Sequence, residues 1–201
     1  MRIRIIATTL ALACLPARNA RAEEPEATTG FGMLITAGGG VEDFVDPALR
    51  DSTGVSGTWN ARYAIGTRLP VTLELGYAGS AQTIDAIGMS SGALLLGNSL
   101  ETGLRLNATT DATVQPYLYA GVAWRHYTLG NVDVNTSDVA DEDDVVEIPF
   151  GVGAAYRISG VVADFRVGVR LASEQDMVPS SEGDFQAMNR WGAAAALGYE
   201  F

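Results

Sequence analysis

Eight separate stretches of the chain alternate between apolar residues and polar or small residues. The clearest is Val162–Ala172, where Ala163, Phe165, Val167, Val169 and Leu171 share one parity and Asp164, Arg166, Gly168 and Arg170 share the other. Successive side chains of a strand point to opposite faces, whereas a helix would scatter these charges around its circumference. The alternation therefore predicts β-strands with one apolar face and one polar face.

The predicted strands are long. They cover Phe31–Val41, Val55–Gly66, Val71–Ile84, Leu94–Asn107, Gln115–Leu129, Glu147–Arg157, Val162–Ala172 and the last segment, Trp191–Phe201. Most span about 9–14 residues, the length of a tilted membrane strand, whereas strands of soluble domains peak near 5–6 residues. In the less regular fifth segment we expect Arg125 and Gly121 to face inward, and Leu118, Val122 and Trp124 to face outward.

Composition narrows the class of protein. The 201 residues include 13 Lys and Arg against 24 Asp and Glu, one Cys and one His, with a net charge of −11. Nucleic-acid binding needs a basic surface, and a disulfide framework or a Cys-rich zinc site needs more cysteines. Past the N-terminus no apolar run reaches the roughly 18 residues of a membrane helix. The chain is therefore either a soluble β-rich domain or a membrane β-barrel.

The N-terminus resembles a secretory signal. Residues 1–22 combine a positive start, the apolar stretch Ile5–Leu15 and the small-x-small pattern Ala20-Arg21-Ala22. Cys14 loosely fits a lipoprotein processing box, but simple removal with the signal is the favoured interpretation. Cleavage removes four arginines and no acid, which changes the net charge from −11 to −15. We expect 23–30 to form a short periplasmic lead and 31–201 the barrel.

The connections alternate in length. Short links follow the second, fourth and sixth strands, at Thr67–Pro70, Ala108–Thr113 and Ile158–Val161. Mostly longer links follow the odd strands, at Glu42–Gly54, Asp85–Gly92, Gly130–Val146 and Ser173–Met188. Bacterial outer-membrane barrels alternate short periplasmic turns with long extracellular loops in this way. The pattern predicts that both termini lie on the periplasmic side.

Charge on the polar faces is nearly balanced. These faces carry six arginines and five carboxylates, which are Arg62, Arg105, Arg125, Arg157, Arg166, Arg170, Glu74, Glu101, Glu147, Asp164 and Glu200. The closed interior of an eight-stranded barrel requires such balance, because an unpaired buried charge is costly and a solvent-facing charge is not. We therefore predict a polar lumen network of Arg62, Glu74, Glu101, Arg105, Arg125, Arg157, Asp164, Arg166 and Arg170. A salt-bridged filling is favoured over a conducting pathway.

Several segments resemble the small outer-membrane β-barrel proteins related to the transmembrane domain of OmpA and to OmpX. They are Gly38–Phe44, Glu101–Asn107, Pro116–Trp124 and the ending Leu197-Gly198-Tyr199-Glu200-Phe201. The ending is the most specific, because the alternating Ala195, Leu197, Tyr199 and Phe201 look like the signal read by the barrel-assembly machinery. No enzyme signature of the family's catalytic members is visible, and because we expect no periplasmic domain after the barrel, the resemblance does not imply peptidoglycan anchoring.

Two features suggest chemistry. His126 is the only histidine, and lipid A deacylases of the outer membrane use a Ser–His–acid arrangement, but no Ser-Asn signature adjoins His126. An interfacial role is the favoured interpretation of this residue. The acidic run Asp138–Glu147 offers oxygen ligands for divalent cations yet lacks EF-hand spacing, so a solvated loop is favoured.

The prediction is an all-β, eight-stranded antiparallel up-and-down transmembrane β-barrel of the bacterial outer membrane. It is expected to be monomeric, non-catalytic and without cofactor, with a structural or surface-interaction role through acidic extracellular loops. Its expected partners are outer-membrane lipid, lipopolysaccharide, the assembly machinery and, at the loops, divalent cations; nucleic acid is not one. The alternatives are a lipid A-modifying outer-membrane enzyme and a soluble periplasmic lipocalin-like binding protein.

Overall fold

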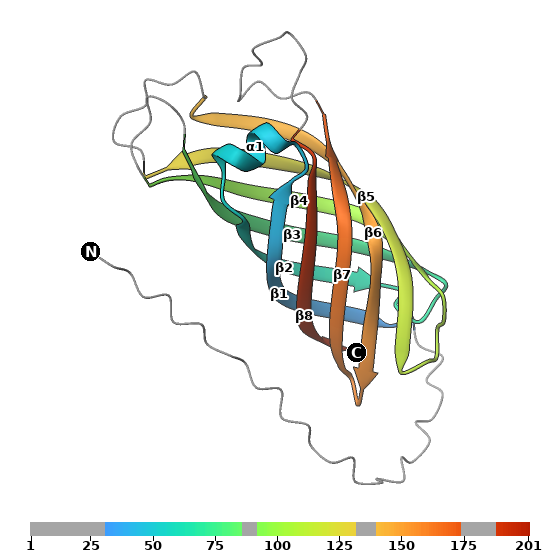
Figure 1. Cartoon of the computed structure of the whole chain (residues 1–201). Coiled ribbons are helices and arrows are strands. Elements are labelled where there is room, and N and C mark those ends of the chain that lie inside the picture. The colour runs from blue at the N-terminus through green and yellow to red at the C-terminus, as the bar shows by residue number, and fades with distance from the viewer. Residues whose placement is uncertain (1–30, 86–91, 132–139, 174–187) are drawn as a thin grey trace, which may run out of the picture.

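The eight strands close into one antiparallel barrel in which each strand pairs with its neighbours in the sequence (Figure 1). The computed structural model describes residues 31–85, 92–131, 140–173 and 188–201. The elements are β1 (Met33–Phe44), α1 (Pro47–Ser52), β2 (Ser56–Ile65), β3 (Val71–Ile84), β4 (Ala93–Asn107), β5 (Val114–Gly130), β6 (Glu142–Ile158), β7 (Val161–Ala172) and β8 (Arg190–Glu200). The predicted fold class is confirmed.

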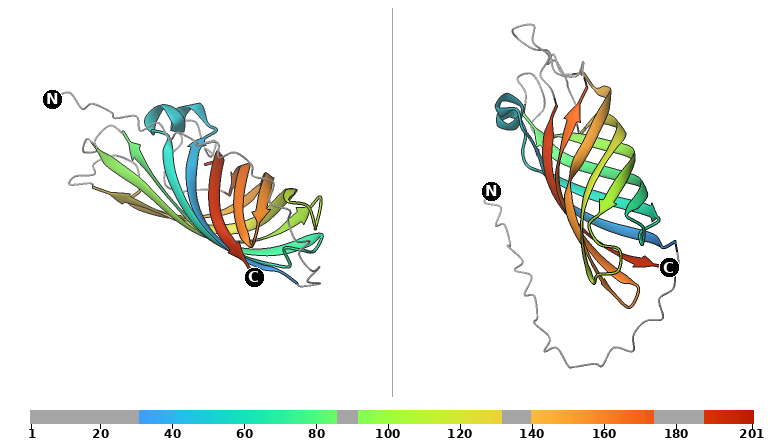
Figure 2. Two further views of the ribbon diagram at one scale, coloured as in Figure 1. Left: turned by 90° about the horizontal axis from the view of Figure 1, so that it is seen from below. Right: turned by 90° about the vertical axis from the view of Figure 1, so that its right-hand side faces the viewer.

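Pairing of β1 with β8 closes the barrel. The register runs from Leu34 opposite Glu200 to Phe44 opposite Arg190. Beyond it, the Met33 N–H donates to the Phe201 carbonyl at 3.0 Å, and the Phe201 N–H donates back at 2.9 Å. Closure leaves no edge strand, which matters because hydrocarbon offers no hydrogen bonds to an unpaired backbone. The strands cross the barrel obliquely, as in other closed barrels (Figure 2).

The apolar faces point outward. The side chains of Leu118, Val122 and Trp124 are 56%, 53% and 50% exposed. They alternate with buried or half-buried residues of β5, as predicted. The buried side chains include large charged ones, such as Arg105, Arg125 and Glu147. A soluble lipocalin-like barrel would have the reverse arrangement, with its apolar faces inside. The outward apolar band therefore argues against that alternative.

Two strands extend well beyond their predicted bounds. β1 continues through Glu42 to Phe44, and the connection after it contains α1, which begins where Asp46 accepts the amide of Ala48 at 2.8 Å. β6 begins at Glu142 rather than Glu147, because its pairing with β5 continues to Thr128 opposite Glu142. The acidic residues at this end conceal the alternation in the sequence. No helix in the described residues is long and apolar enough to cross a membrane.

An apolar cluster lies at the α1 end of the barrel, opposite the start of β1 and the end of β8. It joins residues from α1 and from the ends of six strands or their flanks, which are Phe44, Leu49, Ile84, Ala93, Leu95, Tyr127, Val145 and Met188. A smaller cluster toward the other end contains Leu34, Ala64, Tyr117, Ala155 and Val162. Between these apolar clusters lies most of the buried charge.

Candidate functional site: the charged lumen

The buried charges nearest α1 form one connected group, here called the upper cluster. It consists of Glu42, Glu101, Arg125, Glu147, Arg170 and Arg190. Arg125 Nη2 lies 2.8 Å from Glu42 Oε1, although their strands β1 and β5 are not neighbours, so the contact crosses the interior. Arg190 donates to both Glu42 and Glu147. The three arginines and three carboxylates balance.

A second group, the lower cluster, lies nearer the start of β1 and the end of β8. It consists of Glu74, Arg105, Asp164 and Arg166. Arg166 binds the Glu74 carboxylate with two parallel bonds of 2.7 and 2.6 Å, and its Nε donates to Asp164 at 3.0 Å. Such bidentate pairs are among the stronger ionic contacts in proteins. Two arginines and two carboxylates balance here as well.

Aromatic rings support the lower cluster. Arg105 Cζ lies 3.7 Å from the centre of the Tyr117 ring, and the Tyr117 hydroxyl donates to Asp164 at 2.7 Å. A Cβ on Gly153 would lie 2.3 Å from Tyr117, and one on Gly168 would lie 2.2 Å from the Tyr119 hydroxyl. Inward glycines therefore make room for tyrosines as well as for arginines.

Polar contacts cross the lumen at the end where β1 begins and β8 ends. Glu200 accepts a hydrogen bond from Thr67 and lies 3.5 Å from Arg157 Nη2. The Gln115 amide, buried beside them, donates to the Thr67 carbonyl at 3.4 Å and accepts from Arg105 at 2.6 Å. These contacts join the lower cluster to the turn between β2 and β3.

Side chains of all nine predicted network residues face the interior, and eight of them form ion pairs. Arg62 is the exception: its guanidinium donates to Asn60 at 3.0 Å, and no carboxylate among the described residues pairs with it. Glu42 and Arg190 were not predicted to face the lumen, because Glu42 was assigned to a connection and Arg190 lies between the last predicted connection and the last predicted strand. The alternation of faces would have identified both residues. Glu42 follows the outward-facing Val41 and Arg190 precedes the outward-facing Trp191, so each of the two faces inward.

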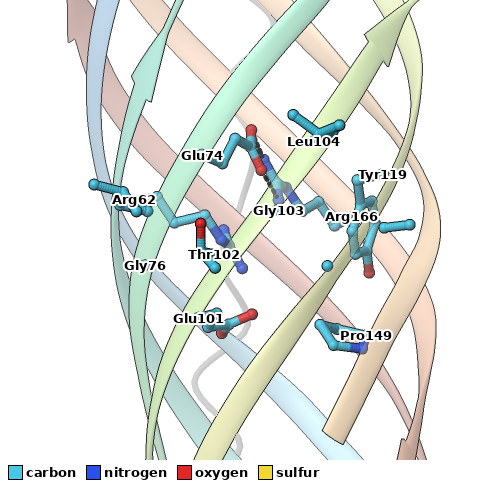
Figure 3. Close-up of a pocket in the computed structure, with 13 residues that line it drawn as sticks. Arg62, Glu74, Gly76, Glu101, Thr102, Gly103, Leu104, Tyr119, Pro149 and Arg166 are labelled. Atoms are coloured by element: carbon cyan, nitrogen blue, oxygen red, sulfur yellow. Dashed lines mark hydrogen bonds and ion pairs between the residues drawn. The ribbon is translucent and has the colours of Figure 1, made fainter.

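Two small cavities lie in the middle of the lumen, with volumes of about 30 and 60 Å³. Arg62, Tyr119 and Arg166 line both of them. Figure 3 shows the smaller cavity, with the Arg62 guanidinium between the carboxylates of Glu74 and Glu101 in this view. By the volume that one water molecule needs, each of these two cavities holds only a few water molecules.

The only histidine lies on the outer face of β5 near the α1 end. His126 Nδ1 is 2.8 Å from Asp144 Oδ1 across the β5–β6 pair, and its ring stacks at 6.3 Å on Trp124. Within the described ranges, no hydrogen bond joins His126 to a hydroxyl group. The described residues contain no group of three His, Cys, Asp or Glu side chains placed to hold a metal ion. Part of the acidic run, 138–139, and all of residues 1–30 lie outside the described residues.

Comparison with known proteins gives one family and several similar folds. A family model described as the outer membrane protein beta-barrel domain matches residues 7–201. No curated protein matches the sequence. Neisserial surface protein A is similar, with a TM-score of 0.54 and 11% identity over 85% of this chain and 96% of that one. A major outer membrane protein from Thermus thermophilus (TM-score 0.53, 15% identity) and Ail, the attachment invasion locus protein of Yersinia pestis (0.51, 10%), each align over 85% of this chain and 98% of their own. At these identities the likeness concerns the fold.

Proposed function

Because this chain belongs to the outer membrane protein β-barrel domain family, we propose that it is a non-catalytic, non-conducting barrel that acts at the cell surface. It is a small outer-membrane β-barrel protein, and the proposal concerns what such a barrel does. The observation that carries it is the filled lumen. A barrel whose interior is occupied by its own side chains offers neither a pore nor an internal substrate pocket, which leaves its exposed ends and loops for function.

Three layers fill the lumen. The upper and lower clusters each satisfy their own charges, and the apolar cluster around Phe44 and Leu49 covers the α1 end. An ion crossing the barrel would have to separate these pairs and displace that cluster. Breaking a buried ion pair costs several kcal/mol, on the order of 3–5. The lumen therefore supports a structural role for the predicted polar network.

The proposed orientation places the termini and short turns in the periplasm and the α1 end outside. The longer connections then face the medium and carry most of the net negative charge, which suits a surface-interaction role with lipopolysaccharide or divalent cations. Cysteine at Asp143, beside the connection between β5 and β6, should react with a membrane-impermeant maleimide on intact cells. Cysteine at Asp111, in the turn between β4 and β5, should not react until the membrane is opened. The opposite result would reverse the orientation.

The proposed lack of conduction is tested by reconstitution. Purified protein in liposomes should produce no solute permeability above that of protein-free vesicles, with a porin as the positive control. Solute uptake that scales with the amount of folded protein would overturn the non-conducting role.

A surface role predicts that replacing Glu142, Asp143 and Asp144 by their amides alters adhesion of expressing cells to a cationic surface. The matched change Asp111→Asn should leave adhesion unchanged.

The proposed assembly signal comprises Ala195, Leu197, Tyr199 and Phe201. The Phe201 side chain is exposed, while its backbone closes the barrel against Met33. Deleting Phe201 would remove both, so Phe201→Ala is the cleaner test because it keeps the backbone contact. Assembled protein in the outer membrane should fall, whereas Phe31→Ala, an exposed phenylalanine at the same end, should leave it unchanged. Equal levels of the two variants would refute the signal.

A lipid A-modifying enzyme is the second candidate, and one contact favours it. Asp144 orients His126 as the acid of a hydrolytic triad orients its histidine. The nucleophile is the missing part, since Thr128 is the next residue on the same face of β5 and forms no hydrogen bond with His126 that the structure describes. The lipid A mass spectrum of cells expressing His126→Ala decides this question. A profile identical to that of wild-type cells and of cells without the protein removes the enzyme.

A further inference from the structure

Charge in the lumen does not balance completely. Among the described residues, the charged side chains on the inward parity of the strands are seven arginines (Arg62, Arg105, Arg125, Arg157, Arg166, Arg170 and Arg190) and six carboxylates (Glu42, Glu74, Glu101, Glu147, Asp164 and Glu200). Asp43 is also buried, but it has the outward parity of Val41 on β1. The upper cluster accounts for three of each, the lower cluster for two of each, and Arg157 pairs with Glu200. The remaining positive charge belongs to Arg62.

Arg62 has few protein groups to satisfy it. Among the described residues its guanidinium donates to Asn60, a neutral acceptor. The nearest carboxylates, Glu74 and Glu101, are already bound by Arg166 at 2.6 Å and Arg170 at 2.9 Å. An uncompensated charge inside a closed barrel is expensive, because the surroundings cannot solvate it as bulk water does. A guanidinium also keeps its charge at every accessible pH, so loss of a proton does not relieve the cost.

The larger cavity is placed to relieve it. Its volume is about 60 Å³, and three arginines line it: Arg62, Arg166 and Arg170. The Asn60 amide and the Tyr119 hydroxyl add polar groups to the wall. Glu42 is the one carboxylate in the lining, and both Arg125 and Arg190 already bind it. The cavity is therefore small and electropositive.

We propose that this cavity binds one small monovalent inorganic anion, of the size of chloride, as the counter-ion of Arg62. The ion would make the lumen electrically neutral, with Arg166 and Arg170 contributing to the field that holds it. The small volume of the cavity excludes large anions. This proposal stands independently of the proposed surface role.

The direct test is anomalous diffraction with bromide as the probe. The full chain from residue 23 is refolded from urea into detergent in sodium bromide and crystallised in the same salt. The expected result is an anomalous peak beside the Arg62 guanidinium, in the cavity between β2 and β7. A well-ordered lumen with water alone at this position, while bromide occupies other sites, would overturn the proposal.

A solution test uses stability at constant sodium concentration. Replacing gluconate, which is too large for the cavity, by chloride should stabilise the barrel; chloride at ten times its Kd lowers the unfolded fraction about 11-fold. Arg62→Gln should abolish the difference between the two salts, while Arg50→Gln on exposed α1 should retain it. Equal stability of the wild-type protein in both salts would overturn the proposal, even if Arg62→Gln fails to fold.

Discussion

The outer face and the lumen are built from the same eight strands, yet they tolerate change in opposite ways. Outside, residues such as Leu118 and Val122 need only be apolar, because fluid lipid adapts to their shapes. Inside, Arg166 must meet both Glu74 and Asp164 at hydrogen-bond distance. The interior therefore requires particular charged residues at particular positions, whereas the exterior requires only apolar side chains that suit lipid. Substitutions at paired positions test this contrast.

The largest effect is expected from breaking the lower cluster. Arg166→Met removes the closest ion pairs of Glu74 and Asp164 and leaves them only Arg105 among the described residues, at 3.9 and 3.5 Å. Loss of one partner from a buried pair should lower the free energy of unfolding by about 3–5 kcal/mol, measured in urea with detergent or lipid. Arg50→Met on exposed α1 is the control and should change it little. A loss under about 1 kcal/mol at Arg166 would contradict the importance of the lumen pairs.

A charge on the outer face should be nearly as damaging. Val122 lies at the middle of β5 and points outward. Val122→Arg should cost about 2–4 kcal/mol in a lipid bilayer, because the guanidinium would lie in hydrocarbon. Val122→Leu should stay within about 0.5 kcal/mol, since it changes only shape. Similar stabilities for the two variants in liposomes would mean that this face is not in lipid.

Packing inside the barrel gives a smaller effect. A Cβ on Gly97 would lie 2.5 Å from the Arg125 guanidinium, whereas one on Gly57 would meet nothing within 4 Å. Gly97→Ala should therefore destabilise the barrel by about 1–3 kcal/mol, the usual range for overpacking. Gly57→Ala should have almost no effect in the same urea titration. If both variants behave alike, Arg125 has more freedom than its contacts indicate.

The smallest effect separates two buried tyrosines. The Tyr127 hydroxyl is buried with no hydrogen-bond partner among the described residues, whereas the Tyr117 hydroxyl donates to Asp164 at 2.7 Å. Tyr127→Phe should leave stability unchanged or raise it by up to about 1 kcal/mol, because it removes an unsatisfied polar group. Tyr117→Phe should lower stability. Thermal unfolding followed by gel mobility distinguishes the two, and a clear loss at Tyr127 would reveal an undescribed partner.

The sequence predicted the fold well because the parity rule is local. Three properties of individual segments led to the correct number of strands and to the correct facing of their side chains. They are the eight stretches of alternation, the short links after the even-numbered strands and the balanced charge of the polar faces. The ends of strands were harder, because Glu42 and Arg190 lie where polar residues suit both a loop and a lumen. Extending the alternation by one residue beyond Val41 and beyond Trp191 would have included both.

Pairing in the lumen was beyond the sequence. Parity predicts that Arg62 and Arg166 both face inward, but the opposite wall that each side chain reaches depends on the stagger of the closed barrel. Glu74 lies 92 residues from Arg166 in the chain and three strands or more away around the wall in either direction. The structure was therefore needed to show that Arg62 is the arginine without a carboxylate partner among the described residues.

Four consecutive alanines of β8 provide the most direct test of a lipid-facing exterior around a sealed interior. Ala193 and Ala195 point outward, while Ala194 and Ala196 point inward. Each is changed singly to Cys in the chain from residue 23, which has no other cysteine. In liposomes a water-soluble maleimide should modify none of the four, although all should react after unfolding and Asp143→Cys should react throughout. Rapid reaction at the inward pair would mean an open, water-filled lumen, and reaction at the outward pair would place that face in water.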